Sequence, residues 1–375
     1  MTSSSAVAWR LTVPGGDGDA PYNLAESTVR SLSLAELLAL AREEAGFDTL
    51  ALDYGDPAGT PGLRAAVADN CGVPPEQVVT VPGSMLGLFL LASALGGDDA
   101  VLVTPCFDPV RGALARAGLA ARSVHMRFDE GYRTDVARIA AALRPETRLL
   151  CLADPQNPSG VRVPRAAIAA LLEEMARRSP QALLFLDETY REATHGGAPP
   201  PSAAGLDPRV VTAGSVSKAH GAPGLRIGWL TVPEAGLRER LVAAKESLLI
   251  SGSVLDEALG AALLRRGGAV LAARRRALGT AFAAVQRWQA QHAGLVEMVH
   301  PDAGALCCLR LHPRHVTAAG VKRFWAALPQ QHLRLAPGPW FGESDRIFRL
   351  GFGHLLLADL TAALPLLSQA LQAAA

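Results

Sequence analysis

Short apolar runs rich in β-branched residues alternate with helical stretches through most of this chain, and this alternation limits the possible folds most strongly. Runs that are apolar at nearly every position are typical of strands buried on both faces of a sheet. Such strands, alternating with helices, form a mainly parallel sheet with helices packed on both sides. The sequence therefore predicts a three-layer α/β protein. The predicted strands span 78–81, 100–104, 123–126, 148–153, 182–186, 210–213 and 226–232, and the predicted helices between them span 85–95, 110–117, 134–143 and 165–178.

The pattern changes toward the end of the chain. Helical sequence dominates residues 233–292, and after Pro301 strand-like and helical segments follow each other in an α+β pattern. Strands are expected near 305–311, 333–335 and 347–352, followed by a helix from about Ala358.

No low-complexity linker and no internal repeat divides the chain. We therefore expect a large domain at residues 45–249 and a smaller α+β domain at residues 250–375. The smaller domain should also include part of an N-terminal arm at residues 1–44, so that both chain ends build it.

Composition excludes some partners. The chain has 375 residues and 49% hydrophobic content, enough to bury a large core. A net charge of +1 without a long Lys/Arg block argues against nucleic acid or an anionic membrane as a partner. The first 14 residues lack the apolar segment of a signal peptide, and the longest apolar run, residues 85–95, is too short to span a bilayer.

The cysteines are also informative. Most lie in apolar strands, and they lack the CxxC spacing of zinc or redox sites. We interpret them as buried, reduced thiols, and so expect a cytoplasmic protein. They are Cys71, Cys106, Cys151, Cys307 and Cys308.

A lysine follows two serines at the end of predicted strand 210–213, in the run Ser215-Val216-Ser217-Lys218. Arg226 comes eight positions after Lys218. A lysine amine can form a Schiff base with an aldehyde, while serine hydroxyls and a guanidinium can bind a phosphate. Pyridoxal 5′-phosphate (PLP) carries both groups, although S-x-S-K also occurs in proteins that do not bind it.

Two further motifs follow predicted strands. Gly83-Ser84-Met85 forms a glycine turn at the start of a helix, where free backbone N–H groups favour an anion. An ordinary strand-to-helix turn would have the same sequence. Asp187 closes strand 182–186, at the carboxyl edge where ligands of α/β sheets bind, and a buried carboxylate needs a partner. Asp187 as a helix N-cap and Asn157-Pro158 as a simple turn are the alternatives.

Arg349 lies in an apolar strand after Ile347-Phe348, where a charge needs a counter-ion. A substrate carboxylate would supply one, as would an Asp or Glu of the chain itself. Phe107 could stack on a ligand ring or belong to the core. His125 and His300 have no second ligand at metal spacing, so no metal site is predicted.

The set of motifs, in this order, resembles the fold-type I PLP-dependent aminotransferases of class I/II, the aspartate aminotransferase superfamily. Matching segments run from Tyr54 to Gly353 and thus cover most of the chain. The resemblance implies that Lys218 forms the Schiff base and moves the substrate Cα proton, and that Asp187 pairs with the pyridine nitrogen. Tyr190 and Asn157 would bind the phenolic oxygen of the cofactor.

The resemblance also assigns the remaining contacts. Phe107 would stack on the cofactor ring, and Arg349 with Asn157 would bind the substrate α-carboxylate. Tyr54 would reach the phosphate of a partner subunit, which implies a homodimer. The phosphate of the same subunit would be bound by Gly83, Ser84, Met85, Ser215, Ser217 and Arg226.

The implied activity is transfer of the amino group of an α-amino acid to a 2-oxo acid. Another PLP reaction on the same fold, such as β- or γ-elimination, cyclisation or oxidation, remains open. A non-enzymatic regulator of this fold would need a helix-turn-helix segment, for which residues 1–44 are too few. Residues 23–27, which should line the substrate pocket, depart from the patterns of aspartate, aromatic or histidinol-phosphate specificity, so no side-chain preference is predicted.

Overall fold

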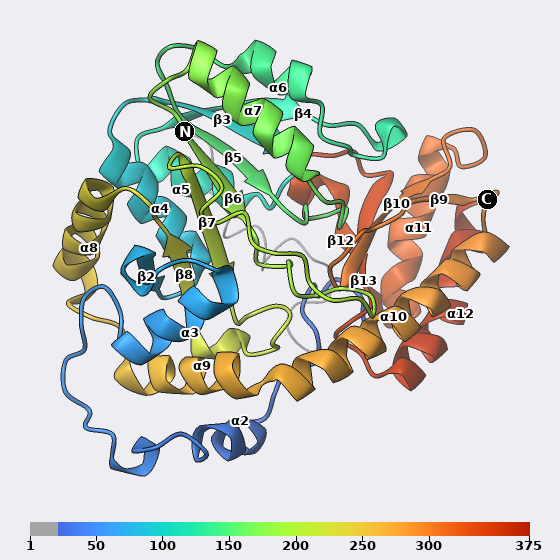
Figure 1. Cartoon of the computed structure of the whole chain (residues 1–375). Coiled ribbons are helices and arrows are strands. Elements are labelled where there is room, and N and C mark those ends of the chain that lie inside the picture. The colour runs from blue at the N-terminus through green and yellow to red at the C-terminus, as the bar shows by residue number, and fades with distance from the viewer. Residues whose placement is uncertain (1–21) are drawn as a thin grey trace.

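The protein is represented by a computed structural model, which describes residues 22–375. Its largest element is a seven-stranded sheet of order β2-β8-β7-β6-β5-β3-β4 (Figure 1). Strand β8 runs antiparallel to both neighbours, and the other neighbouring pairs are parallel. The predicted mainly parallel sheet is therefore confirmed. Its strands are β2 (Val78–Val81), β3 (Asp99–Thr104), β4 (Ala120–His125), β5 (Thr147–Ala153), β6 (Leu183–Asp187), β7 (Val210–Ser215) and β8 (Gly228–Thr231).

Helices cover both faces of this sheet, because successive side chains of a strand point to opposite sides. Leu102 of β3 packs in one cluster with α4, α5 and α8, whose bounds are Ser84–Leu95, Pro109–Arg116 and Ala235–Leu249. The next residue, Val103, packs in another cluster with α6 (Val136–Ala142) and α7 (Arg165–Arg178). This arrangement confirms the predicted three layers.

A third group of helices packs beside β2 and β8. Leu63 and Leu259 belong to one buried cluster that also holds Trp229 of β8. The long α10 leads from this group toward the C-terminal part of the molecule (Figure 1). The helices of this group are α2 (Leu34–Ala41), α3 (Pro61–Cys71) and α9 (Val254–Arg266), whereas α10 (Gly268–Gln291) packs in the core of the C-terminal part.

The C-terminal part contains a second, antiparallel sheet of order β12-β13-β10-β9. A short parallel pair joins β1, near the start of the described chain, to β11. None of the described helices is long and apolar enough to cross a membrane. The strands and helices are β1 (Tyr22–Asn23), β9 (Val296–Val299), β10 (Leu306–Leu311), α11 (Ala318–Gln330), β11 (Leu333–Arg334), β12 (Ala336–Pro337), β13 (Ile347–Gly351) and α12 (Leu357–Ala374).

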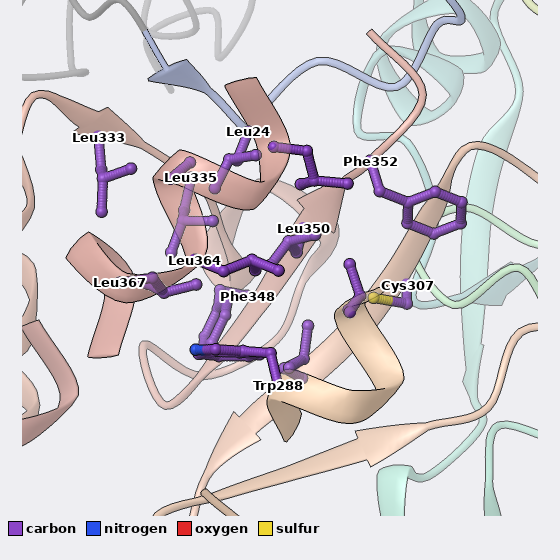
Figure 2. Packing of buried hydrophobic residues seen from close by; sticks show 14 of the residues in the cluster. Leu24, Trp288, Cys307, Leu333, Leu335, Phe348, Leu350, Phe352, Leu364 and Leu367 are labelled. Atoms are coloured by element: carbon purple, nitrogen blue, oxygen red, sulfur yellow. The ribbon is translucent and has the colours of Figure 1, made fainter. Parts of the chain in front are cut away.

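The core of this second part joins residues from both ends of the chain. Figure 2 shows Leu24 in the same buried cluster as Leu335, Leu350 and Phe352. Helix α9, in contrast, packs on α2 and α3 beside the large sheet. We retain the division into residues 1–44, 45–249 and 250–375 as a proposal, and residues 1–21 of its N-terminal arm lie outside the described residues.

Three central strands of the large sheet end at the same level. In the register of the sheet, Ala153 of β5 lies beside Asp187 of β6, and Asp187 lies beside Ala213 of β7. The polar segments that follow these strands therefore meet at one edge of the sheet. This edge faces β13 of the second sheet, whose Arg349 lines the same cavity as Asp187.

Candidate active site

A cavity of about 790 Å³ lies between the carboxyl edge of the large sheet and β13. Its wall is formed by strand ends, by the first turn of α4 and by residues 25–28 near the start of the described chain. Every predicted site residue except Tyr54 lines it. These residues are Gly83, Ser84, Met85, Phe107, Asn157, Asp187, Tyr190, Ser215, Ser217, Lys218, Arg226 and Arg349.

One end of the cavity, lined by Gly83, Ser84, Ser215, Ser217 and Arg226, has the features of a phosphate site. We call it the phosphate-type end. Gly83 caps α4 with φ +87°, and a Cβ atom there would lie 2.4 Å from Nη2 of Arg226. Only glycine therefore allows this guanidinium to approach the start of the helix. Ser215 and Ser217 are buried at the end of β7 and just beyond it. A helix N-terminus, hydroxyl groups and a guanidinium form a donor set that suits a phosphate.

The side chain of Lys218 lines the cavity. Its Nζ donates to Oγ of Ser27 at 3.1 Å, and Oη of Tyr190 donates to the same oxygen at 3.1 Å. Ser27 is only 4% exposed, so these bonds are shielded from water. A residue far away in the sequence thus orients the two predicted catalytic groups. Ser27 belongs to the segment 23–27 that we expect to line the pocket, but no motif in the sequence indicates this contact.

The carboxylate of Asp187 has no nitrogen of a Lys, Arg or His within 4.0 Å among residues 22–375. Its Oδ1 accepts hydrogen bonds from the backbone N–H of Thr189 at 3.0 Å and from the Thr189 hydroxyl at 2.5 Å. Burial raises the pKa of Asp187 above its ordinary value, although the Thr189 hydrogen bonds and the charge of Lys218 oppose the shift. A cationic N–H at this place would favour the ionised carboxylate. A protonated pyridine nitrogen is such a group.

Arg349 is buried in the central part of β13, beside Cys308 of β10 and Ala336 of β12. Its Nη1 donates to Oδ1 of Asn157 at 2.8 Å, and its Nη2 donates to the carbonyl oxygen of Ala25 at 2.5 Å. Burial lowers the pKa of Arg349.

Both hydrogen-bond acceptors of Arg349 are neutral. Its Nε is buried without a hydrogen-bond partner, and no carboxylate among residues 22–375 lies within 4.0 Å of the guanidinium. The internal Asp or Glu partner that the sequence left open is therefore not found in the described chain. The guanidinium remains able to bind an anion in the cavity.

Two predicted residues differ in their surroundings. Phe107 is half-buried and lines the cavity, where its ring is available for stacking. Tyr54 is 82% exposed and does not line the cavity of its own chain. Its contact with a partner subunit stays a prediction.

Other cavity residues have no motif that identifies them. Glu26 lies in the segment that should line the pocket, but the sequence assigns it no role. His354, Trp340 and Phe341 are brought in by the second sheet and the loop before β13. Cζ of Arg349 lies 5.0 Å from the centre of the Phe341 ring, so this ring packs against one face of the guanidinium. Among residues 22–375, no group of three His, Cys, Asp or Glu side chains could hold a metal ion.

The donors along this cavity fit PLP. The phosphate-type end, the amine of Lys218 and the uncompensated carboxylate of Asp187 match its phosphate, aldehyde and ring nitrogen. A fold of this type with this site is that of a PLP-dependent enzyme. The sequence model of the family "Aminotransferase class I and II" matches residues 21–363, and the chain belongs to that family. Its cofactor is pyridoxal 5′-phosphate.

Curated relatives carry several activities. Capreomycidine synthase of Streptomyces vinaceus is 31% identical over 340 residues, which cover 89% of this chain and 85% of that protein. Arginine–pyruvate transaminase AruH of Pseudomonas aeruginosa is 29% identical over 245 residues, which cover 59% of this chain and 62% of AruH.

Solved structures agree with the fold. A PLP-dependent aminotransferase from Streptococcus suis has a TM-score of 0.87 at 22% identity, covering 100% of this chain and 98% of its own. The PLP-dependent cyclase OrfR has a TM-score of 0.84 at 25% identity, covering 99% of this chain and 97% of its own. The family and its cofactor are thus defined, whereas the relatives differ in the reaction that they catalyse.

Proposed function

We propose that the protein is an aminotransferase that moves the amino group of an α-amino acid to a 2-oxo acid. The observation that carries this proposal is the convergence of three groups on one cavity: the amine of Lys218, the carboxylate of Asp187 and the guanidinium of Arg349. These groups are suited to move a proton, to bind a cationic ring nitrogen and to bind a carboxylate.

Each group has a defined task in this reaction. Bound PLP supplies an aldehyde and a ring that withdraws electrons from the substrate Cα. Lys218 takes the Cα proton at Nζ and returns it, and Ser27 orients that amine through its hydroxyl oxygen. Asp187 keeps the ring nitrogen protonated, while Arg349 holds the substrate by its α-carboxylate.

Cyclisation of an amino-acid side chain is a second candidate. A capreomycidine synthase matches 89% of this chain, whereas the match to the arginine–pyruvate transaminase covers 59%. The cyclase OrfR has nearly the same fold over 99% of the chain. Cyclisation and transamination share the removal of the Cα proton and differ only in their later steps, so the same residues serve both.

Two experiments test the proposal. Lys218→Ala should abolish the borohydride-reducible link to PLP, and a link that persists on another lysine would refute the role of Lys218. A survey of amino acids with wild-type enzyme should produce a 2-oxo acid and the pyridoxamine form of the cofactor. A cyclase would instead release a cyclic product that retains its α-amino nitrogen, and would leave the cofactor as PLP.

We also propose that the enzyme acts in the cytoplasm as a homodimer. The five cysteines are all free, which is the usual state of thiols in a reducing compartment. Support for the dimer comes from Tyr54, which lies outside its own cavity and is exposed.

A further inference from the structure

The proposed function assigns no role to some of the charged side chains that line the cavity. Lys218 binds PLP, Arg226 approaches the phosphate-type end, and Arg349 binds the α-carboxylate. The described lining then contains no other Lys or Arg for a second substrate carboxylate. Apart from Asp187, the carboxylate and imidazole groups of the lining are those of Glu26, Asp108 and His354. The described lining of this chain therefore supplies no cation for the second carboxylate of a dicarboxylic amino acid.

The Glu26 carboxylate is held in place by the backbone next to it. Oε1 accepts hydrogen bonds from the N–H of Ser27 at 2.8 Å and from the N–H of Thr28 at 3.2 Å. The side chain is half-buried and lines the cavity. These two bonds restrict the carboxylate before any ligand binds, which lowers the entropic cost of binding.

No cation of the described chain pairs with this carboxylate. No nitrogen of a Lys, Arg or His among residues 22–375 lies within 4.0 Å of its oxygens. Burial disfavours its charge, but Lys218, the Ser27 N–H and Arg349 together hold the pKa of Glu26 below its ordinary value. The cavity therefore contains an oriented anion that has no direct ion-pair partner.

We propose that Glu26 binds the cationic end of the substrate side chain, so that the substrate is a basic α-amino acid with a guanidinium or ammonium group. This inference rests on the proposed function, because it requires Arg349 to hold the α-carboxylate of the same molecule. Glu26 and Arg349 then bind opposite ends of the substrate. A carboxylate that lies in a partly desolvated cavity distinguishes a guanidinium from a neutral urea of the same shape.

A pair of unreactive ligands tests this inference in the PLP-loaded enzyme. 5-Guanidinopentanoate and 5-ureidopentanoate have the same length and both lack the amino group, but only the first is cationic. Calorimetry should give wild type at least tenfold tighter binding of the guanidino ligand. Glu26→Gln keeps the Oε1 acceptor but removes the charge, and should bring the two affinities within about threefold of each other.

Matched variants make the test specific. Asp108→Asn changes the other lining carboxylate whose role is not assigned, and should leave the preference in place. Glu26→Arg should reverse it, so that hexanedioate binds better than 5-guanidinopentanoate, a gain that a misfolded variant cannot show. An unchanged preference in Glu26→Gln, a loss confined to Asp108→Asn, or no preference in wild type would overturn the inference.

Product analysis separates this inference from the proposed function. Transamination of L-arginine and L-citrulline at equal efficiency, with no effect of Glu26→Gln, would refute the role of Glu26 and leave the aminotransferase intact. A binding preference that depends on Glu26, without any 2-oxo acid product, would support the role of Glu26 and refute the aminotransferase activity.

Discussion

Two charged side chains of the site, Arg349 and Asp187, have no oppositely charged partner within 4.0 Å among residues 22–375. Each is fixed instead by neutral groups, through Asn157 and Ala25 for the arginine and through Thr189 for the aspartate. Burying an unpaired charge is costly, so a ligand that carries both complementary charges is stabilised at both points.

Arg349→Ala should lower kcat/KM for amino acids by about 30- to 1000-fold, equivalent to about 2–4 kcal/mol, because it removes a bidentate charge-assisted pair. Affinity for PLP should change little, since Arg349 lies on the substrate side of the cavity. Steady-state kinetics with a PLP titration would measure both. Arg349→Lys is the control that keeps the charge without the planar fork. If wild type uses amines that lack a carboxylate as well as it uses amino acids, the assignment fails.

Asp187→Ala should retain PLP through the phosphate-type end and Lys218 but lower turnover by orders of magnitude. Without the carboxylate the ring nitrogen loses its proton, and the ring then withdraws fewer electrons from the substrate. Absorbance spectra would report bound PLP, and a single-turnover reaction would report the rate. Near-normal turnover with PLP still bound would place the site elsewhere.

At the scale of elements, a partly buried ion pair links β3 to β4. Asp99 of β3 accepts two hydrogen bonds from Arg122 of β4, at 2.8 Å and 2.6 Å, and one from Thr147 of β5 at 2.6 Å. The hydrogen bonds from Arg122 outweigh burial and lower the pKa of Asp99. The pair therefore stabilises the folded sheet at neutral pH.

Asp99→Asn should lower the free energy of unfolding by about 2 kcal/mol at pH 7. A carboxyl whose pKa is lowered by folding contributes its stabilisation above its ordinary pKa of 3.8 and loses it as the pH falls through the folded-state value. Urea denaturation should thus show the gap between wild type and variant closing below about pH 4. Asp98→Asn, at the exposed neighbouring carboxylate, should have little effect at any pH. A gap that stays constant with pH would contradict the ion-pair explanation.

The sequence predicts the inner strands of the large sheet well, because their apolar runs are buried on both faces. The edge strand β4, predicted at 123–126, spans Ala120–His125 and is mostly exposed or half-buried, so its apolar pattern is weaker. The predicted strand at 226–232 begins two residues too early: Arg226 has φ +54°, and β8 begins at Gly228. Strand β9 and helix α11 are not predicted individually, since neither has a continuous apolar run. Site residues next to strand ends are predictable, whereas the contact of Ser27 with Lys218 depends on packing between the two chain ends.

At the scale of the whole molecule, large exposed apolar side chains gather near Tyr54. Gly55 donates a hydrogen bond to Ser251, so the segment around Tyr54 lies beside the loop after α8. Helix 85–95 is the most apolar segment of the sequence and a candidate for the surface of a dimer, but its large side chains are buried or half-buried. The exposed apolar side chains in the two segments near Tyr54 and Ser251 are Leu50, Leu52, Tyr54, Leu248, Leu249, Ile250 and Leu255.

Mixing inactive Tyr54→Ala with inactive Lys218→Ala subunits should restore part of the activity. If Tyr54 acts on the partner's phosphate, a mixed dimer has one site with both defects and one with neither. Activity after subunit exchange, with exchange verified by differently tagged chains, would measure the recovery. No recovery despite exchange, or a fully active monomer in sedimentation, would refute shared sites.

The backbone of residues 24–28 runs beside β13, as the hydrogen bond from Gly351 to Leu24 shows. A ribosome makes residues 24–28 long before it makes residues 347–351. The large sheet and its phosphate-type end can therefore form on the nascent chain while the substrate side is still missing. Cofactor capture can precede synthesis of β13, but selection of an amino acid cannot.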